Sequence, residues 1–185
     1  MRIYRTFIAP ALAVAVAGCA AESLPVGPPP QATAYTLGAG DKIRVTTFGF
    51  ENLSGEFIIG ADNAIALPLI GAISAKGATP VELQAKITNA LLDRKIVRDP
   101  RVSAEVIEYR PYYILGEVGK PGQYPFTNGL TVLKAVATAQ GFTYRANEKT
   151  IFITRDLTNS EITVPLTPST PVRPGDTVRI AERRL

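Results

Sequence analysis

The sequence predicts an α+β protein made of two small units, each with a sheet of short strands covered by one helix. Short segments rich in β-branched residues recur between turn residues, and 15 Gly and 15 Pro in 185 residues favour many turns. Two helix patterns, after Thr79 and after Thr131, interrupt these strands. We place the boundary between the units at Arg110-Pro111, because proline breaks a strand ladder and restricts the residue before it.

The first unit is expected to begin near Tyr35. Its predicted strands are residues 43–48, 56–60, 64–69, 71–74 and, after the helix, 102–109. Thr79-Pro80-Val81-Glu82 combines an N-cap, a proline at the first helical position and the glutamate of a capping box, so the helix should start there and end before Asp99-Pro100. The predicted core-facing stripe of this helix is Leu83, Ile87, Ala90 and Leu91.

The second unit is expected to open with a hairpin. Residues 112–118 and 124–126 are the predicted strands, and Pro121-Gly122 suits the central positions of a type II turn over residues 120–123. Thr131 offers an N-cap for a helix through Gln140 that Gly141 ends. The predicted inward stripe of that helix is Leu133, Val136 and Ala137, and the remaining strands are residues 151–154, 161–164 and 177–180.

The N-terminus has the pattern of a secretory signal. Two arginines precede the largely apolar residues 7–17, a segment too short to cross a hydrocarbon core of about 30 Å. Val16-Ala17-Gly18-Cys19 resembles a bacterial lipobox, which implies that residues 1–18 are removed and that Cys19, the only cysteine, carries lipid. The alternative is an ordinary signal peptide with a coincidental cysteine. Residues 19–34 contain three consecutive prolines, typical of an extended tether.

Composition argues against several function classes. The chain has no histidine, which removes Ser-His-Asp triads and imidazole metal ligands and disfavours hydrolase chemistry, and we assign no cofactor and no metal site. The net charge of +4 falls to +2 without Arg2 and Arg5, because 18 Lys and Arg then face 16 Asp and Glu. Positive and negative charges are thus nearly equal in number, and the sequence has no run of basic residues. We therefore predict no nucleic-acid binding.

Carboxylates are the remaining candidates for chemistry. Glycoside hydrolysis needs two of them at a suitable separation, which the sequence does not reveal. The available residues are Asp41, Glu51, Glu56, Asp62, Glu105 and Glu117. Most occupy predicted turns or exposed strand positions, where solvation alone explains them, so no catalytic residue is assigned.

Two segments of the chain are similar in sequence: Gly40-Asp41-Lys42-Ile43-Arg44-Val45 and Gly175-Asp176-Thr177-Val178-Arg179-Ile180. A turn that feeds a strand explains both segments, since glycine tolerates positive φ and the aspartate can accept backbone N–H bonds. We favour this turn over a catalytic role for either aspartate.

Several ordered segments resemble the Wza-like family of bacterial outer-membrane polysaccharide export lipoproteins. Residues 35–45, 67–71 and 97–102 are similar to the export domain of that family, and residues 113–118, 121–122, 131–133 and 172–176 to the soluble-ligand-binding β-grasp (SLBB) domain that follows it. The implied organisation is an export domain with a mixed β-sheet and one helix at 35–109, followed by a β-grasp-like SLBB domain at 110–185.

The resemblance implies a ring-forming homo-oligomer, lipid-anchored to the outer membrane and facing the periplasm, which passes capsular or exopolysaccharide from an inner-membrane copolymerase to the surface. Such a protein would be part of a translocon and not an enzyme. Longer members end in an amphipathic helix that spans the outer membrane. Only five residues follow Ile180 here, so we expect membrane contact through the Cys19 lipid alone and exit of polymer through a separate outer-membrane porin. The alternative is a lipid-anchored saccharide-binding module, in which Tyr112, Tyr113 and Tyr124 could contact sugar, although such aromatics more often belong to a core or interface.

Overall fold

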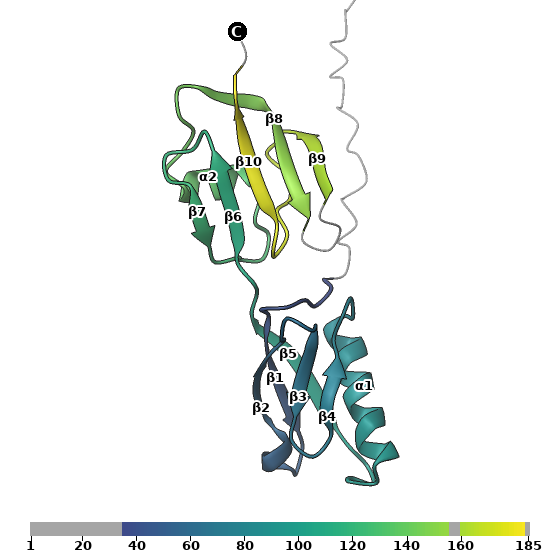
Figure 1. The fold of residues 1–185 in the computed structure, drawn as a ribbon. Helices are drawn as coiled ribbons and strands as arrows, with labels where there is room; N and C mark the ends of the chain where they lie inside the picture. Colours follow the sequence, from purple (N-terminus) through teal and green to yellow (C-terminus); the bar gives the residue numbers. More distant parts are fainter. Residues whose placement is uncertain (1–34, 156–159, 184–185) are drawn as a thin grey trace, which may run out of the picture. The chain divides into compact units, whose positions relative to one another are not determined.

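The computed structural model describes residues 35–155 and 160–183, so the predicted signal, Cys19 and the tether lie outside the described residues. The fold is α+β, as predicted, and strands form three sheets (Figure 1). Among the described residues, no helix has the length and apolar character needed to cross a bilayer.

The first part of the chain contains a three-stranded antiparallel sheet and a separate hairpin. In the sheet, β1 (Lys42–Thr47) lies between β2 (Gly55–Ile58) and β5 (Val102–Glu108), and a 3-10 helix (Glu51–Leu53) links β1 to β2. The hairpin pairs β3 (Ala64–Leu67) with β4 (Gly71–Ser74). These predicted strands are confirmed, with ends shifted by one or two residues.

Helix α1 (Pro80–Asp93) starts where its capping box predicts. The Thr79 hydroxyl accepts the Glu82 N–H at 3.2 Å, and the Glu82 carboxylate accepts the Thr79 N–H at 2.7 Å. Its buried residues are Leu83, Ile87 and Leu91, and Ala90 packs partly buried against the same core. The predicted stripe is therefore confirmed.

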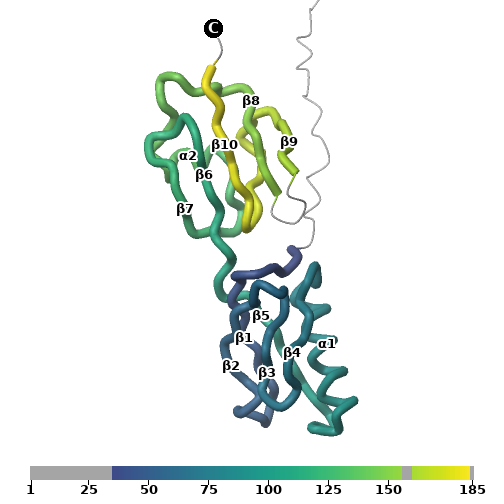
Figure 2. Tube along the Cα trace, in the orientation of Figure 1, coloured from purple at the N-terminus to yellow at the C-terminus, as the bar shows by residue number. Residues whose placement is uncertain are grey.

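The second part contains a five-stranded sheet in the order β7-β6-β10-β8-β9. Its strands are β6 (Tyr112–Gly116), β7 (Gly122–Tyr124), β8 (Ala146–Arg155), β9 (Ser160–Pro165) and β10 (Thr177–Glu182). Strands β6 and β10 are parallel neighbours although the whole second part separates them in sequence, and Figure 2 shows the two segments side by side. The other pairs are antiparallel, so β10 lies between the hairpins β6-β7 and β8-β9, which is a β-grasp arrangement.

Helix α2 (Val132–Thr138) begins at its predicted N-cap, Thr131, but presents a different face to the core. Its buried residues are Val132, Ala135 and Val136, whereas Leu133 is 37% exposed. The predicted stripe of Leu133, Val136 and Ala137 is therefore wrong at two of its three positions. A helix of seven residues rich in alanine and valine offers two nearly equivalent apolar stripes, and packing against the sheet selects between them.

The predicted turn at 120–123 is also wrong. A type II turn needs positive φ at Gly122, but Gly122 already pairs with Ile114 in the sheet and is not among the positive-φ glycines. The chain bends earlier, at Gly116, where φ is +85°. A Cβ at Gly116 would lie 2.0 Å from the carbonyl oxygen of Ile180 in β10, so a strand distant in sequence determines the position of this bend.

Candidate functional site

The carboxylate of Asp41 is completely buried, contrary to the expectation that solvation explains the acidic residues. It accepts hydrogen bonds from the Tyr35 hydroxyl (2.5 Å), the Gly38 N–H (2.9 Å), the Arg110 N–H (2.9 Å) and the Arg110 guanidinium (3.1 Å). Arg110 is itself buried, so this is an internal ion pair rather than a free acid. Its hydrogen bonds satisfy both oxygens and assign Asp41 a structural role.

Asp176 repeats the local geometry of Asp41, as the similarity of residues 175–180 to residues 40–45 predicts. Its carboxylate accepts the N–H of Arg173, three residues earlier, at 2.8 Å, just as Asp41 accepts that of Gly38. Its own N–H donates to the Arg173 carbonyl at 3.1 Å, and Gly175 between them has a φ of +80°. The interpretation as a recurrent turn is confirmed.

The electrostatic environment of Asp176 is nevertheless unusual. Burial raises the pKa of its carboxyl from 3.8 to about 6, although the Arg173 N–H and the Arg155 guanidinium, at 2.5 Å, act in the opposite direction. Burial and the hydrogen bond to Asp41 likewise raise the pKa of Tyr35. These two groups lie in or beside the two turns, and burial is the largest cause of each shift.

The remaining acidic candidates form local pairs. Glu56 bonds Lys42 at 2.7 Å and Arg44 at 2.9 Å, and these two cations lower its pKa. Glu117 accepts the Thr143 hydroxyl. In residues 35–155 and 160–183 no three His, Cys, Asp or Glu side chains gather into a cation site.

Asp62, Glu105 and Glu51 complete the acidic set. Asp62 accepts the Ala64 N–H at 3.2 Å and Glu105 the Ser103 hydroxyl at 3.4 Å. Glu51 is exposed in the first turn of the 3-10 helix. Each therefore has a local or solvated environment, in line with the expectation.

The three tyrosines considered for sugar contact separate into two groups. Tyr112 is 1% exposed and stacks on Tyr124, with ring centroids 5.9 Å apart, so it belongs to the core of the five-stranded sheet. Tyr113, the next residue along β6, is 41% exposed on the opposite face. Of the three, Tyr113 is the one that a ligand on that face could reach.

The face of the five-stranded sheet that carries Tyr113 is the candidate site, and we call it the open face. Residues such as Ile114, Ile151 and Val178 point into the core with α2, so their neighbours along the strands lie on the other side. Strand register aligns one row of open-face residues, Leu115, Arg179, Phe152 and Thr163, and a second row, Tyr113, Thr177, Thr154 and Glu161.

Arg179 occupies the middle of the open face. Its guanidinium lies over the Phe152 ring, 4.1 Å from the centroid, and makes two hydrogen bonds to Glu161, at 2.7 and 3.1 Å. Arg179 and Glu161 keep 42% and 43% of their side-chain surface exposed. The arrangement presents a fixed, half-exposed guanidinium on an aromatic support.

A bulge in β8 hollows the sheet beside this guanidinium. The register passes from Ile180↔Ile151 to Glu182↔Ala146, so β8 advances five residues where β10 advances two. The Asn147 side-chain oxygen stabilises the bulge by accepting the N–H groups of Lys149 and Thr150. The resulting open hollow has a volume of about 910 Å³ and is lined by residues 146–150, Phe152, Arg179 and residues 181–183.

Sequence reasoning missed Arg110, Phe152 and Arg179. The sequence places Arg110 only at the junction of the two units, since its partner Asp41 is 69 residues away. Phe152 and Arg179 lie in predicted strands, and strand alternation places them opposite Ile151 and Val178. That alternation could have identified the open face, but not the pairing of β8 with β10.

Comparisons with known proteins agree with this architecture. Residues 29–107 match the family model described as polysaccharide biosynthesis/export protein, and residues 110–180 match the SLBB domain. The exopolysaccharide production protein ExoF of Rhizobium meliloti is 35% identical over 122 residues, which cover 60% of this chain and 29% of that protein. The EPS I polysaccharide export outer membrane protein EpsA of Ralstonia solanacearum is 29% identical over 160 residues, 80% of this chain and 42% of that protein. The chain thus spans less than half the length of both relatives.

Proposed function

We propose that the chain is an outer-membrane component that conducts capsular or exopolysaccharide across the periplasm, because it belongs to the polysaccharide biosynthesis/export family. This is a transport family rather than a catalytic one. The observation that carries the proposal is an export domain followed by an SLBB domain in one chain, each with its own hydrophobic core. The name of EpsA, an outer membrane export protein, supports the location.

We propose further that copies of the chain assemble into a ring. Strands β2 and β5 form the edges of the first sheet, and β7 and β9 the edges of the second. Unpaired edges must be covered or paired, and a head-to-tail contact whose rotation closes produces a ring. These edges support self-association, while the number of copies is left open.

Anchoring through lipid on Cys19, with the folded part facing the periplasm, is part of the same proposal and rests on the lipobox pattern. The inner-membrane copolymerase, the separate outer-membrane porin and the expectation of no cofactor stay predictions.

The function is tested in the producing cell by deletion of the gene. We expect secreted polysaccharide to disappear from the surface and the medium and to return when the full chain is supplied. Normal secretion by the deletion strain would refute a role in export.

The alternative, a lipid-anchored saccharide-binding module that is not a conduit, is favoured by the open face and its hollow. Chemical crosslinking of the lipidated protein in its own membrane separates the two. A conduit predicts crosslinked species larger than a dimer, whereas a strictly monomeric protein would leave only the binding module.

A further inference from the structure

We propose that the exported polysaccharide strand is bound on the open face of the SLBB sheet, in the hollow beside Phe152 and Arg179. The inference rests on the proposed function and adds the site at which this chain contacts its cargo. Three features carry it: the guanidinium on its aromatic support, the polar wall of the bulge, and the composition of the open face.

The guanidinium of Arg179 can donate hydrogen bonds to sugar hydroxyls. Its two bonds to Glu161 use two of five N–H donors and fix the plane of the group, so three donors remain available without further ordering of the side chain. Leu115 is Arg179's neighbour across the strands and is 44% exposed. A pyranose ring has apolar C–H faces and a hydroxyl edge, and this part of the sheet offers a partner for each.

The bulge supplies the second set of polar groups. Asn147 uses its side-chain oxygen to hold the bulge, and no described residue engages its amide N–H donors. Thr150 adds a hydroxyl, and the exposed Glu148 and Lys149 add an acceptor and a donor at the same wall. Donors and acceptors therefore converge on a hollow whose volume of about 910 Å³ has room for sugar residues of a strand.

The composition of the open face favours a glycan over a second copy of the chain. A stable protein interface buries about 800 Å² on each partner around a desolvated apolar centre. Here the central charges are already paired, Arg179 covers Phe152, and three of the eight residues in the two rows are threonines. Apart from Tyr144, the most exposed large apolar residues lie in the first part of the chain: Val81, Phe48, Leu69 and Ile58.

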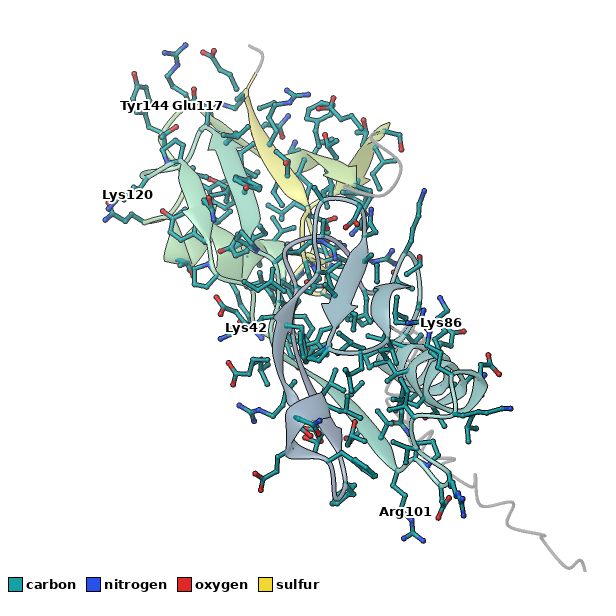
Figure 3. All side chains as sticks on the ribbon, turned by 60° about the horizontal axis from the view of Figure 1, so that its bottom comes forward. Lys42, Lys86, Arg101, Glu117, Lys120 and Tyr144 are labelled. Atoms are coloured by element: carbon teal, nitrogen blue, oxygen red, sulfur yellow. The ribbon has the colours of Figure 1, made fainter. Side chains whose placement is uncertain are left out.

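Photocrosslinking in polymer-producing cells tests the site directly. The photoreactive amino acid p-benzoylphenylalanine replaces Lys149 at the hollow or, as a control, Lys86 on α1, which Figure 3 labels on the helix. We expect the full-length chain labelled at 149 to give a light-dependent, carbohydrate-positive adduct. The adduct should be absent in cells that lack the glycosyltransferase that starts the polymer, and at least tenfold weaker at position 86.

A substitution supplies the second readout. Arg179→Gln should reduce both the carbohydrate adduct at position 149 and the secreted polymer at least fivefold, without changing crosslinked oligomers or the melting temperature. Arg44→Gln is the matched control, because Arg44 is also an exposed arginine paired with a glutamate on a sheet surface, and it should change neither readout.

Each contrary result has a distinct meaning. An adduct between two copies of the chain at position 149 would make the open face an interface and overturn the proposal. Equal carbohydrate labelling at position 86 would also overturn the site proposal, as would the absence of an adduct at position 149 while secretion is normal. In each of these cases the proposed export function would still stand. If cells without the chain secrete polymer normally, the proposed function is wrong and the site proposal falls with it.

Discussion

At the residue scale, the buried pair of Asp41 and Arg110 joins two segments that are 69 residues apart in the sequence. Removing one charge of a buried pair is costly, because the remaining charge stays desolvated and loses the attraction of that partner. Tyr35 adds a bond to each partner, from its hydroxyl to Asp41 and from the Arg110 guanidinium at 3.1 Å. The cluster therefore connects the first described residue to the start of the SLBB region.

Asp41→Asn should lower the free energy of unfolding by about 3 kcal/mol, because the amide removes a buried negative charge 3.1 Å from the Arg110 guanidinium. Urea unfolding of the purified full chain, followed by circular dichroism, measures this change. The matched control is Asp99→Asn, which removes an 86% exposed carboxylate 3.9 Å from Arg101 and should cost less than about 0.5 kcal/mol. Equal effects of the two substitutions would contradict the structural role of Asp41.

Asp176 makes stability depend on pH in a direction opposite to that of most paired carboxylates. Its pKa is about 6 in the folded chain against 3.8 for the ordinary residue, so between these values the folded state binds more protons than the unfolded state. The contribution of Asp176 to stability is therefore greatest below about pH 4 and falls as the pH rises to about 6. The total loss is about 3 kcal/mol at most.

Asp176→Asn should remove this slope. Urea unfolding of wild type and variant at pH 4, 5, 6 and 7 gives the comparison, and the stability of the wild type relative to the variant should decrease from pH 4 to pH 6. Asp62→Asn, which changes an exposed turn carboxylate, should keep the wild-type profile. Parallel profiles for Asp176→Asn and the wild type would show that Asp176 does not titrate in this range.

At the scale of elements, the bend after β6 depends on contact between strands. Gly116 has a φ of +85°, and any Cβ there would lie 2.0 Å from the Ile180 carbonyl oxygen of β10. Gly129 has a similar φ, +73°, but nothing lies within 4 Å of its Cβ position. Substituting alanine at Gly129 therefore tests backbone strain alone, whereas substituting it at Gly116 adds a steric clash with β10.

Gly129→Ala should cost only the left-handed strain of about 1 kcal/mol, whereas Gly116→Ala should cost at least about 3 kcal/mol or prevent folding of the SLBB region. Thermal unfolding and the yield of folded protein measure both variants. A Gly116→Ala protein as stable as Gly129→Ala would show that β6 and β10 do not approach as described.

The elements also show how far the sequence could predict the fold. Helix α1 starts directly after its N-cap Thr79, as predicted, because the signal is local, with Glu82 three residues from Thr79. The bend at Gly116 and the buried face of α2 depend on β10 and on the sheet, so local patterns could not predict them. The same limit applies to the candidate site, because strand alternation indicates a face for Phe152 and Arg179 but not that β8 pairs with β10.

At the scale of the whole molecule, two separate hydrophobic cores follow one another along the chain. The first includes Leu37 and Ala104, and the second runs from Tyr112 to Ile180, so Arg110 lies between the two in sequence. Each part therefore has its own apolar source of stability, which is the organisation expected of consecutive domains.

Lipid on Cys19 would determine where these two parts act. The sequence predicts that fifteen residues, 20–34, separate Cys19 from Tyr35, which at roughly 3.1 Å per residue allows about 45 Å between lipid and folded chain. One acyl chain gives only marginal membrane binding, so the several chains of a bacterial lipoprotein are needed for a stable anchor.

Mass spectrometry of the membrane-extracted protein should therefore find a mature N-terminus at Cys19 that carries diacylglycerol and a further acyl chain. Cys19→Ser should lack this modification and its cleavage, because serine has no thiol to form the thioether. The same variant behind an ordinary cleavable signal controls for folding: it should keep the thermal unfolding of the wild-type folded part while losing the lipid. A wild-type protein with a free, unmodified Cys19 thiol would rule out the lipid anchor, and the site proposed on the open face could then still be tested independently.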